Sequence, residues 1–311
     1  MESQSDSAYL NCSNARATLL KLYNLDTPGS LDDAVDRLVE WVQKQEHFTK
    51  KDLPREFLEK SLLLAKNGSL EVTKKKIEKL LTVRTLLPYL FGRYNVKKDL
   101  YVKNIIHVPL PRLTSDFYRL YLLKMTEGNL TTDDLIKSYR RGVYMTEYGV
   151  KHDYFAGLIF IYDFRQANVL DLIAKFSMTN PRLYLTLIEA YGARVKAIHV
   201  VMKNATFAEA IMSVMKQILS DKLLKRAQIH KNIESVYNYV PRDLLPVDYG
   251  GKEKSLLELN EYWMDTLSTE EHINYVDSMN EAKTDESRRI GDTFNTEHLG
   301  MPGTFRSFVV D

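Results

Sequence analysis

The sequence has one cysteine, almost no net charge and no long hydrophobic run. The single cysteine, Cys12, excludes an intramolecular disulfide and a cage of thiolate metal ligands. Lys and Arg total 43 against 41 Asp and Glu, a balance that argues against a dedicated nucleic-acid-binding protein. No stretch stays apolar for long enough to form a transmembrane helix, and residues 1–10 lack the basic and apolar segments of a signal peptide. The 311 residues, 44% of them hydrophobic, therefore predict a folded cytoplasmic protein.

Sequence motifs of common enzymes are absent as well. The chain has no G-x-S-x-G elbow, phosphate-binding glycine loop, H-E-x-x-H or C-x-x-C. Two residues remain candidates for acid–base chemistry in an α/β enzyme: His199 lies within an apolar run, and Asp163 ends another. Without a partner nucleophile, a hydrogen-bonded core histidine and a carboxylate that accepts hydrogen bonds from a loop are the favoured interpretations. We therefore expect a protein that is not an enzyme and has no catalytic residue, metal or cofactor.

Residues 1–104 predict a small all-helical domain. Apolar residues recur on one helical face in the stretch 31–42 and again around Pro54–Ala65. A third helix follows Ser69 and ends at Pro88, and its expected buried side includes Arg84.

Residues 105–277 predict an α/β domain with a mainly parallel sheet. Three short apolar runs, Arg119–Lys124, Gly157–Asp163 and Arg194–Met202, fit strands that are covered on both faces. Helical stretches of crossover length separate these runs. A further helix is expected from Asp221 to about His230. Residues 278–311 are polar and predict a flexible or surface-wrapped tail.

Two further features carry functional information. The helix expected at Thr206–Leu219 is apolar around most of its circumference, which is usual for a core helix but also suits a cover over an apolar cavity. Charge is unevenly distributed: residues 44–103 have an excess of +8 (15 basic, 7 acidic), and residues 261–311 an excess of −7 (4 basic, 11 acidic). Lys222 and Arg226 lie four residues apart just after the apolar helix. Such basic residues form either an ordinary solvated face or a patch that attracts anionic lipid headgroups.

Several segments, in order along the chain, carry a resemblance to a known family. Leu245–Gly251 (LPVDYGG) is close to the signature L-P-x-E-Y-G-G. Gly157–Asp163 and Tyr191–Val201 look like two strand motifs, and Leu110–Thr114 looks like a Leu-Pro segment that precedes the first strand. Gly300–Asp311 is similar to the ending common in insect members. On these motifs the chain resembles the CRAL-TRIO family of lipid-binding proteins.

The resemblance implies a fold, a function and a set of site residues. The fold is a helical N-terminal domain followed by an α/β lipid-binding domain, with Thr206–Leu219 as a mobile gate helix. The function is cytosolic binding and intermembrane transfer of a tocopherol-, retinoid- or carotenoid-like lipid by a monomer that docks on phosphoinositide-bearing membranes. The residues that the resemblance places on the cavity wall are Tyr144, Val169, Ile173, Leu183, Leu187, Tyr191, Ile198, Phe207, Ile211 and Met215. Those that it places at the phosphoinositide headgroup are Arg194, Lys222 and Arg226.

The chain also departs from the family pattern near the gate. Gly192 replaces the usual proline before one strand, and Met202–Ala205 (MKNA) lacks the proline that usually follows it. These changes leave a second hypothesis open, in which the domain has lost its cavity and acts as a protein-interaction or phosphoinositide-sensing module.

Overall fold

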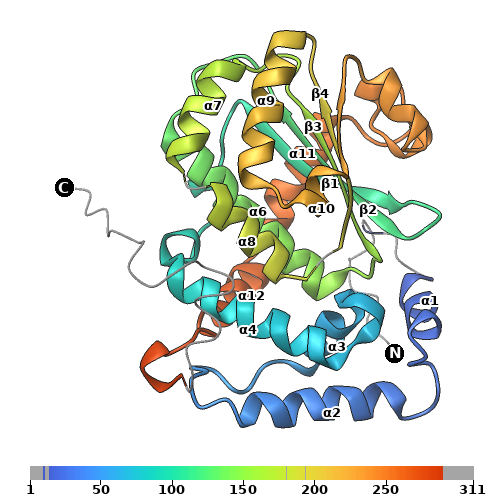
Figure 1. Cartoon of the computed structure of the whole chain (residues 1–311), viewed down its shortest axis with the longest axis vertical. Coiled ribbons are helices and arrows are strands. Elements are labelled where there is room, and N and C mark those ends of the chain that lie inside the picture. The colour runs from blue at the N-terminus through green and yellow to red at the C-terminus, as the bar shows by residue number, and fades with distance from the viewer. Residues whose placement is uncertain (1–9, 11–13, 180, 193, 290–311) are drawn as a thin grey trace.

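The computed structural model describes residues 10, 14–179, 181–192 and 194–289, which form a layer of helices beside an α/β layer (Figure 1). The N-terminal helices are α1 (Ala15–Leu22), α2 (Ser30–Gln43), α3 (Arg55–Leu64), α4 (Leu70–Leu86) and α5 (Val96–Asp99). Helices α2, α3 and α4 pack on one another around Leu38, Leu62 and Leu80, which are almost fully buried. The predicted apolar faces therefore meet in one core, to which residues of the second layer such as Val143 and Leu187 also contribute.

A five-stranded sheet forms the centre of the second layer. Its strands are β1 (Ile105–Leu113), β2 (Tyr118–Met125), β3 (Gly157–Asp163), β4 (Val195–Val201) and β5 (Ala227–His230), in the spatial order β1-β2-β3-β4-β5. Strands β2 to β5 run parallel and β1 runs antiparallel to β2. The predicted mainly parallel sheet is thus confirmed, with an antiparallel edge strand added.

Helices connect the parallel strands and close the chain. They are α6 (Thr132–His152), α7 (Val169–Met178), α8 (Pro181–Ala190), α9 (Ala205–Ile218), α10 (Asp221–Leu224), α11 (Leu256–Leu267) and α12 (Glu270–Asn280). Short 3₁₀ helices are η1 (Lys66–Gly68), η2 (Pro88–Leu90), η3 (Glu234–Asn238), η4 (Arg242–Leu244), η5 (Val247–Tyr249) and η6 (Glu286–Arg288). Helices α7, α8 and α9 lie on one side of the sheet, and α11 packs against β1 (Figure 1). No helix in the described ranges is both long and apolar enough to cross a bilayer.

Two strands differ from the sequence expectations. Leu110–Thr114, expected to precede the first strand, lies in and just beyond β1, because an edge strand tolerates Pro109 and Pro111. The helix expected from Asp221 to about His230 ends at Leu224, and the last four residues form β5 instead. Pairing with β4 decides this conformation, since four residues carry too little local preference to decide it themselves.

The two candidate acid–base residues have structural partners. Asp163 accepts hydrogen bonds from the backbone and side chain of Arg165 and from the hydroxyl of Tyr249. Burial acts to raise the pKa of Asp163, but these hydrogen bonds hold it below its usual value. His199 Nδ1 lies 3.0 Å from Nε2 of His230, so His199 has the hydrogen-bonded core environment that the sequence favoured.

Acidification from pH 7 to pH 5 is expected to lower the free energy of unfolding. Burial lowers the pKa of His152, His199 and His272 to about 4, so these rings stay neutral in the fold but take up protons near pH 6.5 in the unfolded chain. Their stabilising contribution is therefore complete above about pH 6.5 and is lost as the pH falls toward 4, with a slope of up to about 1.4 kcal/mol per pH unit for each ring. Urea titrations at pH 7, 6 and 5 measure this slope. In H152F the slope is expected to be smaller by the contribution of one histidine. An unfolding free energy that is constant between pH 7 and pH 5 would contradict the prediction.

The described part of the predicted tail packs on the helical layer. Helix α12 extends to Asn280, and the chain then runs beside α4, where Arg289 forms ion pairs with Glu78 and Glu286. The backbone nitrogen of Thr49 donates to the carbonyl of Lys283 at 3.0 Å. Cys12 and Gly300–Asp311 lie outside the described residues.

Candidate functional site

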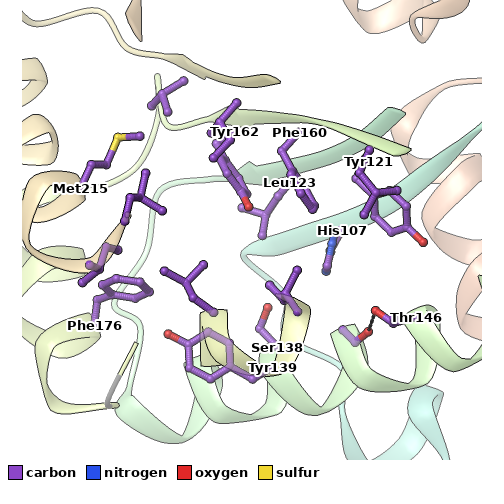
Figure 2. Close-up of a pocket in the computed structure, with 18 of the residues that line it drawn as sticks. His107, Tyr121, Leu123, Ser138, Tyr139, Thr146, Phe160, Tyr162, Phe176 and Met215 are labelled. Carbon is purple, nitrogen blue, oxygen red and sulfur yellow. Dashed lines mark hydrogen bonds between the residues drawn. The ribbon is translucent and has the colours of Figure 1, made fainter. Parts of the chain in front are cut away.

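An apolar cavity of about 210 Å³ lies between the sheet and helices α6 to α9 (Figure 2). The sheet contributes side chains in alternation, because every second residue of a strand points to the same face. One row across the strands is Tyr121, Phe160 and Ile198, and the next is Leu123, Tyr162 and Val200. The sheet therefore forms a continuous aromatic and aliphatic floor.

Helices α6 and α9 form two further walls of the cavity through residues at helical spacing. On α9 the wall consists of Ile211, Val214, Met215 and Ile218, which fall at positions i, i+3, i+4 and i+7. Asn204 caps α9, because its side chain accepts a hydrogen bond of 2.8 Å from the backbone nitrogen of Thr206, two residues on. Phe176 and Met215 project into the cavity from α7 and α9, opposite the side chains of the sheet (Figure 2).

The structure places about half of the predicted wall residues on the cavity. Ile173, Tyr191, Ile198, Ile211 and Met215 line it. The side chain of Leu183 lies outside the described part of the chain.

The other four predicted wall residues point elsewhere. Tyr144 lies on a different stripe of α6, where its hydroxyl donates to the carbonyl of Gly92 at 2.9 Å. Leu187 is buried in the core of the helical layer, Val169 is buried where α7 begins, and Phe207 packs half-buried on the main core. Helical periodicity predicts that a residue is buried, but two buried stripes on one helix cannot be told apart without the packing.

Sequence reasoning missed the wall residues of β1, β2, β3 and α6. The missed side chains that carry polar atoms are His107, Tyr121, Ser138, Tyr139, Thr146 and Tyr162 (Figure 2). An available signal for α6 was the spacing of Leu135, Ser138, Tyr139 and Gly142, which is one helical stripe. No comparable signal existed for β1, because its prolines obscured the strand itself.

A fully buried ion pair lies directly behind the cavity wall. Arg84 of α4 and Glu147 of α6 approach to 2.5 Å, and neither side chain is exposed to solvent. The hydroxyl of the wall residue Tyr191 donates to the same carboxylate oxygen at 2.5 Å. Burial and the neighbouring carboxylate raise the pKa of Tyr191 well above its usual value, so this hydroxyl keeps its proton. The pair joins the helical layer to the cavity wall.

Basic side chains gather where α4 meets the segments before β4 and β5. Arg194 and Lys222 are exposed, and Arg226 donates to the carbonyl of Val195. Burial, with a smaller effect from Lys222, lowers the pKa of Lys76 to about 8, so Lys76 and Lys222 lie close enough to repel each other. Among the described residues none of these four cations pairs with a carboxylate, and the cluster therefore attracts anions. The sequence suggested that Lys222 and Arg226 lie on one helix face. They do not, because α10 ends at Leu224, before Arg226.

No group of three or more His, Cys, Asp or Glu side chains within the described ranges comes close enough to hold a metal ion. Among the residues that the structure describes, the cavity wall contains no Asp, Glu, Lys or Arg. The arrangement is therefore suited to enclosing an apolar molecule.

Comparisons with known proteins agree with this geometry. Residues 117–251 match the sequence profile of the CRAL/TRIO domain. The human protein named alpha-tocopherol transfer protein-like is 27% identical over 100 residues, which make up 30% of this chain and 28% of that protein. The mouse protein of the same name is 26% identical over 100 residues. This chain therefore aligns with 28% of the length of the curated relatives that it matches.

Among solved structures, one titled "Crystal structure of Sfh5" aligns with a TM-score of 0.49 and 12% sequence identity, over 78% of this chain and 96% of that chain. CRAL/TRIO domains generally bind or transfer lipophilic ligands and are typically not enzymes. The profile match over residues 117–251 and the mixed, mostly parallel five-stranded sheet with helices before it show that this chain has the α/β CRAL/TRIO fold.

Proposed function

We propose that this protein binds a small hydrophobic lipid of tocopherol-, retinoid- or carotenoid-like character in the cavity and carries it between membranes. The observation that carries the proposal is the apolar cavity of about 210 Å³ that α9 covers. Burying roughly 400 Å² of apolar ligand surface contributes about 10 kcal/mol before the costs of ordering. Hydrophobic burial alone is therefore sufficient for tight binding.

Release of the lipid requires α9 to move away from the sheet. Its inner stripe includes Ile211 and Met215, each only 7% exposed, so opening in water would expose apolar surface. A membrane surface removes this cost by accepting the same side chains. Opening is thus expected mainly at a bilayer, which couples release to the arrival of an acceptor membrane.

The basic cluster at Lys76, Arg194, Lys222 and Arg226 supports docking on anionic, phosphoinositide-bearing membranes. Lys222 lies just after α9, and Arg194 lies just before β4, which leads into α9. Docking through these residues would therefore bring the gate to the bilayer.

Two measurements test the proposal directly. Mass spectrometry of lipid extracted from the purified protein shows whether a lipid occupies the cavity, and a fluorescent-lipid assay between vesicles measures transfer. Lipid that copurifies and moves between vesicles supports the proposal. A folded protein that neither retains nor transfers lipid would contradict it and favour the interaction-module hypothesis.

The double variant R194E/K222E is expected to bind vesicles containing phosphatidylinositol bisphosphate about 30-fold more weakly. Each basic residue near an anionic bilayer contributes about 1 kcal/mol, so removing two costs at least about 2 kcal/mol. Vesicle sedimentation and the transfer rate to these vesicles both measure the effect. The control is K103E: Lys103 precedes β1, which runs antiparallel to the other strands, and so lies at the opposite end of the strands from Arg194, which precedes β4. Equal losses in the two proteins would indicate a general charge effect and refute docking at this cluster.

A further inference from the structure

One histidine on the cavity wall has no hydrogen-bond partner. His107 projects from β1 and pairs in register with Leu123, which extends the row of Tyr162 and Val200 to the edge strand. Its Nδ1 atom is buried and has no hydrogen-bond partner among the described residues. An unpaired buried polar group costs about 1–3 kcal/mol, so it calls for an explanation.

The His107 ring is uncharged at neutral pH. Burial, assisted by the nearby Arg141 guanidinium, lowers the pKa of His107 to about 3. A neutral imidazole carries one N–H donor and one acceptor nitrogen. The ring can therefore donate to a carbonyl oxygen or accept from a hydroxyl, and it offers no charge to an anion.

The side chains around His107 further limit which ligands the cavity can bind. The ring points from the sheet toward α6, which carries Ser138 on the same cavity wall (Figure 2). Within the described residues Ser138 has no hydrogen-bond partner for its hydroxyl, whereas the neighbouring wall residue Thr146 bonds to the carbonyl of Gly142 at 2.8 Å. Within the described residues the wall carries no charged side chain, and Arg141 is not part of it, so a carboxylate would lose its hydration without direct contact with a counterion.

We propose that His107 anchors the single uncharged oxygen, hydroxyl or carbonyl, of the lipid in the cavity, and so selects such lipids over hydrocarbons and ionised fatty acids. The inference rests on the proposed lipid-binding function and specifies its ligand. A hydrocarbon would leave His107 unpaired in the loaded protein, while a lipid alcohol would satisfy it. His107 is thus a specificity-determining residue that contributes little to the hydrophobic part of the affinity.

The test compares three probes of equal chain length. The full-length protein is equilibrated with phosphatidylcholine vesicles that contain equal amounts of hexadecane, hexadecan-1-ol and hexadecanoic acid, and the lipid in the separated protein is quantified by mass spectrometry. H107M removes the donor and the acceptor, and H107Q keeps both on a side chain of similar length. The alcohol-to-hydrocarbon ratio is expected to fall about tenfold in H107M and to remain close to wild type in H107Q, because one net hydrogen bond is lost. I106M is the control: Ile106 is the neighbour of His107 in β1, its side chain points to the opposite face of the sheet and is not part of the cavity wall, and the variant is expected to leave the ratio unchanged.

The outcomes separate this inference from the proposed function. Lipid bound with the same ratio in wild type and H107M, or enrichment of hexadecanoic acid, would overturn the role of His107 and leave lipid binding intact. Absence of all three probes from every protein would overturn lipid binding and the inference together. A second measurement needs no variant: the ¹⁵N chemical shifts of the His107 ring in labelled wild type are expected to change with hexadecan-1-ol and not with hexadecane. Equal shifts with the two probes would also refute the inference.

Discussion

Replacing Arg84 with methionine is expected to lower the free energy of unfolding by about 3–5 kcal/mol. The variant leaves the carboxylate of Glu147 buried, and among the described residues only the hydroxyl of Tyr191, at 2.5 Å, still bonds to it. A buried charge without a counterion is costly because burial removes its hydration. Urea unfolding followed by circular dichroism measures the loss.

Two further variants show whether the unpaired carboxylate of Glu147 causes the loss of stability. In R84M/E147Q the carboxylate is replaced by a neutral amide, so a large part of the lost stability is expected to return. R93M breaks an exposed pair, because Arg93 is 47% and Glu270 78% exposed, and it is expected to cost no more than about 1 kcal/mol. Equally small losses of unfolding free energy in R84M and R93M would show that the buried pair stabilises the protein no more than the exposed pair does.

Replacing Ile173 with tryptophan is expected to reduce lipid binding about 50-fold without unfolding the protein. Ile173 lies on the cavity wall in α7, so the larger ring enters the space that the ligand would occupy. Displacing three methylenes of ligand from apolar contact costs about 2.4 kcal/mol, at about 0.8 kcal/mol each. The measurement is the amount of hexadecan-1-ol that the protein retains after equilibration with vesicles.

The same helix provides the matched control for this prediction. Leu170 is 61% exposed on α7, and L170W adds a ring of the same size outside the cavity. We expect L170W to bind lipid as wild type does, and I173W to melt at a temperature no lower than wild type because the ring fills a void. Undiminished binding by I173W would show that the lipid does not occupy this cavity.

Much of the architecture could be predicted from local sequence patterns. Strand β3 has the predicted bounds, Gly157–Asp163, because a strand covered on both faces is a continuous apolar run that turn residues delimit. The apolar stripe of α9 could also be predicted from the sequence, because an apolar helix without ion pairs has to be covered on most sides. Strands β1 and β5 could not be found in this way, because edge pairing rather than local preference stabilises them.

The candidate site was only partly predictable. The resemblance led to Ile173, Ile198 and Ile211, which line the cavity, but also to Tyr144 and Leu187, which do not. Both of these misplaced residues are buried, so burial was predicted correctly and the direction of each side chain was not. The strand register determines which alternate residues face α6 to α9. A shift of one residue would point all of these side chains to the opposite face of the sheet.

The sequence by itself determined that this chain forms a helical layer and an α/β layer, has an apolar helix after its last long strand, and has an excess of basic residues in the segment 44–103. These features follow from periodicity, capping and charge, which act between residues close together in the chain. Only the tertiary structure decided that Arg84 meets Glu147, 63 residues away, and that an unpaired His107 faces an uncharged cavity. Such contacts depend on how complete layers pack, because the free energy of a buried polar group is set by the neighbours that packing brings to it.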